Sequence, residues 1–323
     1  VESRGLGDVY KRQGLVINKF RGDKTILDPG IEMLENLCQK PVVGVAPYLN
    51  IEVEDEDSLT ERFSKNQEVD LIDLAVIRVP RISNFTDFNP FERMPGVSLR
   101  YVSRVSELKN PDLILLPGTK NTMEDLLWMR QNGLEAAVLK AASQGTFIFG
   151  ICGGYQMLGE TLSDPAGVET GGTIKGMGLL PMDTVFSGDK TRTRVQGTFT
   201  GVEGPLSCLN GVELEGYEIH MGESTVGEGQ AHAFAKIYNT VDGTEYMDGC
   251  VCGNVAGTYL HGIFDEKEFC DGFINMLGKR CGIATHGGSD MSFEEYKQRE
   301  YDKLADAIRE NMDMKYIYEI MGL

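Results

Sequence analysis

One cysteine of this sequence stands where a reactive thiol would be placed. Residues 147–149 form a short apolar run that is typical of a buried strand. Residues 153–158 begin with two glycines and continue as helix-forming sequence, so Cys152 falls at a strand-to-helix turn. A nucleophile on such a turn is exposed at the end of its strand, and the amides of the following helix favour a thiolate and can hold an oxyanion. The alternative is a small core residue in a glycine turn. Because the strand, the glycines and the helix agree, we predict a nucleophile.

A thiolate nucleophile needs a base, and only four histidines are present. An apolar run ends at His261 and Gly262, which would place an imidazole at the end of a strand, where α/β sheets carry their functional groups. We therefore predict that His261 is the base rather than a structural histidine. His220 is the second candidate, and side-chain alternation along a strand would put Glu218 on the same face. The other two histidines show no such pattern.

A second apolar run, residues 113–116, ends in a glycine turn ahead of a helical pattern. If both strands belong to one sheet, the amide of Gly118 in this turn would complete an oxyanion hole with the amide of Gly153. An ordinary strand-to-helix loop is the alternative interpretation. We keep Gly118 as a candidate because the turn would lie at the same end of the sheet as Cys152.

The composition argues against several classes of protein. With 49 acidic and 31 basic residues the net charge is −18, which repels phosphate backbones and argues against nucleic acid as a partner. No uninterrupted run of about 18 apolar residues is present, so we predict no membrane span. Seven cysteines at irregular spacing do not form a disulfide framework, which favours a reducing cytoplasm. Cys250 and Cys252 would share a strand face, but further ligands at zinc spacing are missing, so we predict no metal site.

The first part of the chain predicts a small strand–helix–strand unit. Residues 1–13 are polar and without a period, which suggests an extraneous leader. Residues 14–20 and 41–46 are apolar runs typical of buried strands, and residues 28–39 carry a helical pattern. So short a unit cannot enclose a core, and it would be either the edge of a larger domain or a piece of a truncated one. An acidic run at residues 52–57 then predicts a solvated connection.

From residue 70 onward strands alternate with helices, and this pattern predicts an α/β fold with a mostly parallel sheet. Residues 167–257 are rich in glycine, threonine and valine, and they predict an antiparallel extension. The expected strands are residues 72–79, 97–101, 113–116 and 147–149. The expected helices are residues 121–131, 134–144, 266–277 and 293–312.

The residues around Cys152 also carry a resemblance to a known family. The heptapeptide Gly150-Ile151-Cys152-Gly153-Gly154-Tyr155-Gln156 resembles the signature of class I glutamine amidotransferases, and its Gly-Gly-Tyr-Gln form resembles the cobyric acid synthase branch. Further stretches that resemble this branch are residues 16–23, 41–48, 116–120, 217–222 and 259–265. The resemblance implies a flavodoxin-like amidotransferase domain at residues 70–323. Residues 14–66 would then be the remnant of a P-loop domain similar to dethiobiotin synthetase.

The resemblance also implies an activity and a role for each matching residue. Members of that branch amidate side-chain carboxylates of adenosylcobyrinic acid a,c-diamide to give cobyric acid in cobalamin synthesis, and they use ATP, Mg²⁺ and glutamine. Cys152 would attack glutamine and form a thioester, while His261 would activate the thiol and protonate the departing ammonia. The other implied roles are oxyanion binding by Gly118 and Gly153, glutamine seating by Gln156 and nucleobase contact by Asn18.

Two departures from the family pattern change what this chain is expected to do. Many class I amidotransferases carry a glutamate two residues after the histidine, and here that position is Ile263, so the resemblance implies a Cys-His dyad. The phosphate loop should lie well upstream of Asn18, and the sequence holds no G-x-x-x-x-G-K-[ST] motif. We therefore expect this chain to lack ATP-dependent synthetase activity and a tightly bound cofactor. We also expect low glutamine turnover where no acceptor site is present.

Two other functions remain open at this stage. The Gly-Gly-Tyr-Gln motif also resembles the glutaminase subunit of a complex that amidates a peptidoglycan precursor, lipid II. The segment that resembles an ATP-binding domain, fused upstream, argues against that function. The second alternative is a regulator without enzymatic activity, in which Cys152 is a redox sensor on the same fold. Alkylation by a glutamine analogue separates the two classes, since an enzyme requires His261 and a sensor does not. The sequence does not indicate an oligomeric state.

Overall fold

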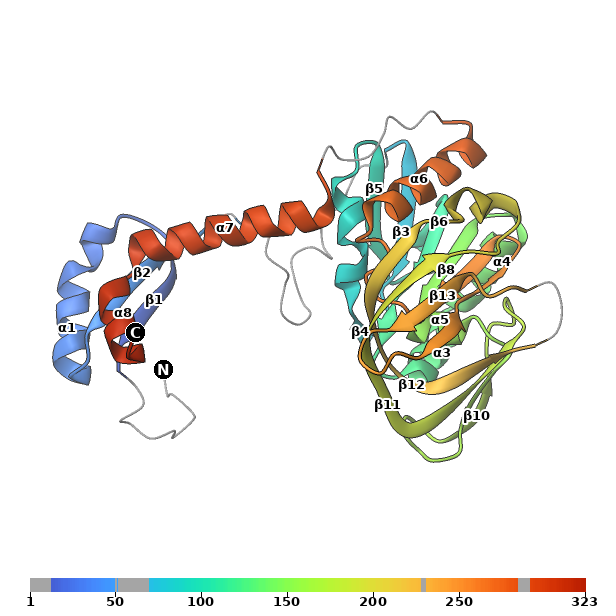
Figure 1. Cartoon of the computed structure of the whole chain (residues 1–323), viewed down its shortest axis with the longest axis horizontal. Coiled ribbons are helices and arrows are strands. Elements are labelled where there is room, and N and C mark those ends of the chain that lie inside the picture. Colours follow the sequence, from blue (N-terminus) through green and yellow to red (C-terminus); the bar gives the residue numbers. More distant parts are fainter. Residues whose placement is uncertain (1–12, 50, 52–69, 228–230, 284–290) are drawn as a thin grey trace. The chain divides into compact units, whose positions relative to one another are not determined.

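The computed structural model describes residues 13–49, 51, 70–227, 231–283 and 291–323 (Figure 1). The chain divides into two units. One unit combines Val1–Glu54 with Glu294–Leu323, and the other is Asp55–Phe293. The acidic run at residues 52–57 and all but the last residue of the expected leader lie outside the described residues.

A mostly parallel sheet forms the centre of the larger unit, as the alternating pattern predicts. Its strands are β3 (Ile72–Ile77), β5 (Val97–Val102), β6 (Leu113–Leu116), β8 (Phe147–Ile151), β15 (Cys250–Cys252) and β16 (Val255–Thr258). They lie in the order β15-β16-β8-β6-β3-β5, and all neighbours pair in parallel except β15 with β16. Every residue of β3, β6, β8 and β16 is buried, because a sheet of this kind is covered on both faces.

Alternate residues of the central strands face two different layers. Leu116 of β6 belongs to the same apolar cluster as Leu126 on one face, and Phe149 of β8 packs edge-on against Phe273 on the other, with ring centroids 5.6 Å apart. The first face is covered by α3 (Thr122–Gln131), α4 (Leu134–Ser143) and α5 (Gly153–Met157), and α2 (Val105–Leu108) precedes β6. The second face is covered by α6 (Lys267–Cys281), by the 3₁₀ helix η4 (Phe85–Arg93) and by part of a second sheet.

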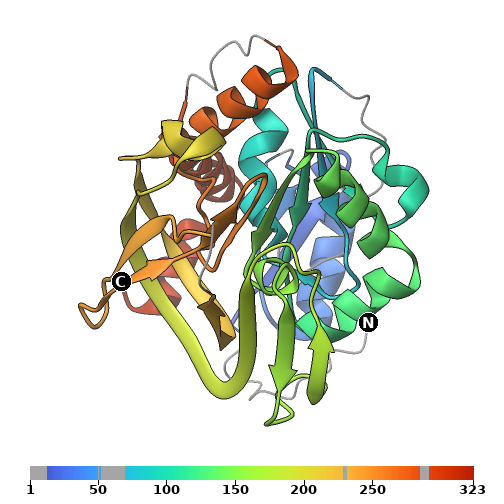
Figure 2. The same ribbon diagram turned by 90° about the vertical axis from the view of Figure 1, so that its right-hand side faces the viewer.

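The second sheet is the predicted extension, and it is mostly antiparallel. Its strands are β9 (Thr161–Asp164), β10 (Gly172–Lys175), β11 (Met182–Phe199), β12 (Glu213–Val226), β13 (Ala235–Asn239) and β14 (Glu245–Asp248). The long β11 and β12 pair along most of their length, and their register shifts between Val185 and Lys190. Figure 2 shows that β11 is strongly curved. The irregular register ends at Lys190, which pairs with Met221 of β12.

Two short elements complete the part of the fold that positions the site. Strand β4 (Ile82–Ser83) pairs antiparallel with β7 (Gly118–Thr119), so the loop after β3 is tied to the loop after β6. Helix η4 follows β4 directly and is largely buried, and it carries Asp87. A further 3₁₀ helix, η5 (Gly204–Leu209), joins β11 to β12.

The smaller unit contains the predicted strand–helix–strand segment together with the C-terminal helices. Strands β1 (Leu15–Phe20) and β2 (Val42–Pro47) pair in parallel, and the other elements are η2 (Lys24–Leu27), α1 (Asp28–Cys38), α7 (Phe293–Asn311) and α8 (Met314–Met321). We expected the C-terminal helices in the amidotransferase domain, whereas residues Glu294–Leu323 group with the N-terminal strands. The amide of Asp313 donates to the carbonyl of Val43 (2.7 Å), and Gly44 pairs with Met312. The edge of β2 that does not pair with β1 thereby gains backbone partners from the C-terminal segment.

The predicted fold class is confirmed. Each strand and helix that was expected in the described residues is present, with ends that differ by at most four residues. Helices η4 and α8 were not predicted, since η4 contains Pro90 and has no helical period, and α8 is short. That residues 14–66 descend from a P-loop domain remains a prediction.

The close approach of α5 to β6 can be tested by substitution. A Cβ atom on Gly154 would overlap the carbonyl group of Leu116, which is fixed in the sheet. We expect Gly154→Ala to lower the free energy of unfolding of the larger unit by about 2 kcal/mol or more, measured by urea denaturation. Gly188→Ala is the matched control, since a Cβ there meets nothing within 4 Å. An unchanged midpoint for Gly154→Ala would contradict this packing.

Candidate active site

Cys152 lies at the predicted turn, between β8 and α5, in a strained backbone conformation. Its φ of 51° and ψ of −111° are unusual for a residue with a side chain, and strain of this kind is characteristic of functional sites. The surrounding backbone holds the turn: the Cys152 amide donates to the carbonyl of Thr258 (2.8 Å), and the Cys152 carbonyl accepts from the amide of Gln156 (2.9 Å). The thiol donates to the carbonyl of Ile219, with a sulfur-to-oxygen distance of 3.6 Å.

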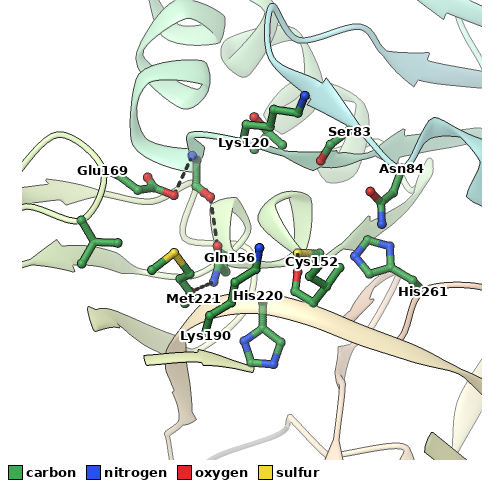
Figure 3. Close-up of a pocket in the computed structure, with 14 residues that line it drawn as sticks. Ser83, Asn84, Lys120, Cys152, Gln156, Glu169, Lys190, His220, Met221 and His261 are labelled. Carbon is green, nitrogen blue, oxygen red and sulfur yellow. Dashed lines mark hydrogen bonds between the residues drawn. The ribbon is translucent and has the colours of Figure 1, made fainter. Parts of the chain in front are cut away.

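His261 is buried beside Cys152, and an aspartate fixes its orientation. The Nδ1 atom of His261 donates to Oδ2 of Asp87 (2.8 Å), and the other Asp87 oxygen accepts from the amide of Gly262 (3.0 Å). The backbone of His261 is paired with that of Tyr217, whose ring stacks on the imidazole at 5.1 Å. The Nε2 atom is buried and has no hydrogen-bond partner in the described residues, and Figure 3 shows the imidazole next to Cys152. It is therefore positioned to exchange a proton with the thiol.

The charge of Asp87 governs the protonation of His261. Burial by itself would lower the pKa of His261, but the carboxylate of Asp87, its hydrogen bond and the neighbouring Cys152 together raise it to about 10. The imidazole is thus held in its protonated form at neutral pH, as an imidazolium beside a thiol nucleophile requires. The sequence predicted neither the partner nor its effect.

The expected Cys-His dyad is therefore incomplete, because the structure adds a third member. Ile263 is fully buried in the apolar core, so the position two residues after the histidine cannot supply an acid. Asp87 supplies it from a segment 174 residues earlier in the chain. The only sequence signal for Asp87 is an acidic residue inside the aromatic run Phe85-Thr86-Asp87-Phe88, where a buried carboxylate needs a partner.

The two glycine turns come together at this site. A Cβ on Gly118 would lie 3.3 Å from Cε1 of His261, so Gly118 borders the imidazole. Gly153 opens α5 against Thr119, and the first amides of a helix have no partner within it. The sequence predicted that the turns after β6 and β8 would meet, because both would lie at the same end of the sheet. Their role as oxyanion donors remains a prediction.

The thiol and the imidazole open onto a pocket of about 330 Å³, a size typical of small-molecule sites. Gln156 lies in its wall, and its amide is fully occupied by the protein (Figure 3). Its Nε2 donates to the carbonyl of Met221 (3.0 Å) and to the hydroxyl of Tyr259 (3.1 Å), and its Oε1 accepts from the hydroxyl of Thr122 (3.0 Å). The geometry therefore makes Gln156 a support of the pocket wall, and direct contact with glutamine remains a prediction.

Glu218 and His220, the second pair of candidate residues, lie in contact with each other in a buried acidic cluster. Oε2 of Glu218 accepts from the hydroxyl of Tyr246 (2.8 Å) and lies 3.6 Å from Nε2 of His220. Burial and the charge of Glu218 raise the pKa of nearby Asp248 to about 6. His220 also lines the pocket and stacks on Tyr259 at 3.9 Å. This cluster supports the wall opposite α3 and is not the partner of the thiol.

Three charged residues of the pocket were missed by the sequence analysis. Lys120, Glu169 and Lys190 line it together with Cys152. Lys120 ends the stretch 116–120 that resembles the family, but Glu169 and Lys190 belong to no recognisable motif, and no spacing in the sequence signals that the three meet. Asn18, in contrast, belongs to the smaller unit, where it is exposed and its Oδ1 accepts from the amide of Lys19 (2.9 Å).

Among the described residues, no set of three or more histidine, cysteine or acidic side chains is arranged to hold a metal ion. In the same part of the chain, no helix combines the length and the apolar character that crossing a membrane requires.

The fold and the site together define a class of protein. A mostly parallel sheet carries a cysteine on a strained strand-to-helix turn, beside a histidine that is oriented by an aspartate. This is the arrangement of an α/β enzyme that acts through a thiol nucleophile.

Comparison with known proteins identifies the family. Residues 73–269 match the family described as the CobB/CobQ-like glutamine amidotransferase domain, and the chain belongs to that family. Cobyric acid synthase from Ruminiclostridium cellulolyticum is 53% identical over 96% of this chain, and the enzyme of that name from Lachnoclostridium phytofermentans is 52% identical over 96%. The chain spans 60% and 62% of the length of these relatives. The structure of PurLQS from Thermotoga maritima is similar with a TM-score of 0.48 and 19% identity, covering 64% of this chain and 99% of that one.

The role of Asp87 can be tested through the reactivity of Cys152. We expect Asp87→Asn to slow alkylation of Cys152 by iodoacetamide at pH 7 by about tenfold or more, because the thiol loses its imidazolium partner. The new side-chain amide would also place a donor opposite Nδ1 of His261 and favour the wrong imidazole tautomer. In comparable triads such a change lowers turnover by about 10,000-fold. Asp242→Asn, which removes the same charge from an exposed loop, is the control. Equal alkylation rates for Asp87→Asn and wild type would contradict this role.

The raised pKa of His261 also predicts a pH dependence of stability. A group whose pKa is raised on folding stabilises the protein fully below its unfolded value of about 6.5, and this contribution is lost as the pH rises toward 10. Wild type should lose up to about 1.4 kcal/mol of unfolding free energy for each pH unit in this window. In Asp87→Asn the loss should be much smaller, so the two urea midpoints should converge between pH 7 and pH 10. Parallel curves would contradict the assignment.

Proposed function

We propose that this chain carries the glutaminase site of a cobyric acid synthase. The observation that carries the proposal is the arrangement of Cys152 on a strained turn beside an imidazole whose far nitrogen is bound by Asp87. The pocket beside them is large enough for an amino acid, and two relatives named cobyric acid synthase share more than half of their aligned residues with this chain.

In the proposed reaction Sγ of Cys152 attacks the side-chain amide carbon of glutamine, and the carbonyl oxygen becomes an oxyanion. The amides of Gly118 and Gly153 are proposed to hold that oxyanion. His261 keeps the thiol proton on Nε2 and gives it to the departing nitrogen, which leaves as ammonia and forms a thioester. Water then attacks the thioester, Nε2 accepts a proton from the water, and glutamate leaves as the sulfur recovers its proton.

The ammonia would serve the amidation of carboxylates of adenosylcobyrinic acid a,c-diamide, which gives cobyric acid in cobalamin synthesis. That step needs ATP and Mg²⁺, and the described residues of the smaller unit do not make a nucleotide site by themselves. The sequence has no phosphate loop motif, and Asn18 is exposed with its side-chain oxygen bound by its own neighbour. No step proposed for this chain passes through the nucleotide.

The two alternatives have weaker support. The lipid II amidating complex shares the Gly-Gly-Tyr-Gln motif, but the relatives that match nearly the whole chain, including β1 and β2, bear the name cobyric acid synthase. A cysteine sensor would need no base, whereas His261 is buried and oriented by Asp87.

A diazoketone analogue of glutamine tests the proposal without requiring turnover. We expect it to label Cys152 stoichiometrically, measured by the mass of the intact protein and of its peptides. Cys152→Ala should abolish the labelling, and His261→Ala should slow it by about 100-fold, the usual contribution of a general acid or base. Cys208→Ala, which removes an exposed thiol, is the matched control. Labelling that ignores His261 would favour the sensor and overturn the proposal.

A further inference from the structure

The loop between β9 and β10 places one carboxylate at the pocket. The side chain of Asp164 is buried at the start of this loop, and its oxygens accept from the amides of Val168, Glu169 and Gly171, each at 2.8 Å. The loop is thereby wrapped around a single carboxylate, which restricts the position of Glu169.

Glu169 is held at its other end as well. Its two carboxylate oxygens accept from the amides of Thr122 (3.0 Å) and Met123 (2.9 Å), at the first turn of α3. Burial raises the pKa of Glu169 above its ordinary value, and the hydrogen bonds from these two amides offset part of that rise. Each oxygen still has a second lone pair, so a bound cation can be accepted without breaking either bond.

The charges along the pocket are separated in space. Glu169 is the only carboxylate among the described residues that line the pocket, and it lies at the opposite end from Cys152, with Gln156 between them (Figure 3). Lys190 points into the middle of the pocket, whereas the amino group of Lys120 points away from Cys152. Lys190 is an exposed residue of β11 and pairs with Met221 of β12, where the regular register resumes after the shift.

A free α-amino acid with a side-chain amide matches this pattern. Its amide carbon would lie at the thiol, its ammonium group at Glu169 and its α-carboxylate at Lys190. The half-buried carboxylate of Glu169 and the exposed ammonium of Lys190 would each pair with the opposite charge of such a ligand. Both amide hydrogens of Gln156 are donated within the protein, so they do not compete for the charged groups of such a ligand.

We propose that Glu169 and Lys190 determine the specificity of this site by binding the α-ammonium and the α-carboxylate of glutamine. The inference rests on the proposed glutaminase function and adds to it the reason why the site takes the free amino acid. An amide without an α-ammonium group, such as a peptide-bound glutamine or glutaramate, would lack the ion pair with Glu169 and bind more weakly than glutamine.

The experiment measures how far L-glutamine protects Cys152 from alkylation by iodoacetamide, a reagent without amino acid groups. Wild type, Glu169→Gln and Lys190→Met are compared, with Glu223→Gln and Lys175→Met as matched exposed controls from β12 and β10. Glutaramate, which lacks the α-ammonium group, is the second ligand. The alkylation rate without ligand reports whether each variant keeps its site.

Glu169→Gln should raise the half-protecting concentration of L-glutamine by about tenfold or more, the value expected when a charged hydrogen bond is lost, and leave that of glutaramate unchanged. Lys190→Met should raise both. The controls should match wild type, and the rate without ligand should change less than about twofold, since neither residue touches the thiol.

Equal weakening of both ligands in Glu169→Gln, or a slower rate without ligand, would show that Glu169 only secures the loop to α3, and the inference would be overturned. Absence of any protection by L-glutamine in wild type would overturn it too. Failure of the proposed function is distinguishable: glutamine would protect Cys152, yet the diazoketone analogue would not label it.

Discussion

The strained turn at Cys152 is the constraint on which the site depends. A residue with a side chain does not adopt this backbone conformation unless its surroundings hold it there. The bond from its amide to Thr258 ties the turn to β16, and the bond from Gln156 to its carbonyl ties it to α5. The absence of a side chain on Gly154 lets α5 lie directly on β6. The same three elements carry the histidine, the nucleophile and the second glycine turn, so one packing arrangement sets the geometry of all of them.

The second feature that organises the site is an ion pair in the protein interior, where burying a charge costs free energy. Asp87 and His261 are both almost fully buried, and an isolated charge in that position would cost several kcal/mol. Each charge satisfies the other, and the amide of Gly262 satisfies the second carboxylate oxygen. The arrangement leaves one polar atom, Nε2 of His261, buried and without a partner in the described residues. Since buried polar atoms are normally paired, this atom is where a reacting group belongs.

Much of this could be predicted from local sequence. The buried strands, the helices that follow them and the glycine turns are encoded in short segments, because apolar period and glycine conformation act over a few residues. Cys152 and His261 were found because each ends a recognisable strand. Asp87, Glu169 and Lys190 were not found, because their roles depend on contacts between segments that are far apart in the chain, and nothing in their immediate neighbours differs from an ordinary loop or helix.

The sequence by itself determined the fold class and the family that the chain resembles, and it predicted a nucleophile and its base. Only the tertiary structure decided that the C-terminal segment completes β2, that an aspartate rather than the residue two after His261 orients the imidazole, and that the amide of Gln156 is used within the wall. The physical reason is common to all three. Backbone groups, buried charges and side-chain amides form hydrogen bonds with the groups that the fold brings close to them. Those partners are known only when every segment of the chain has been placed.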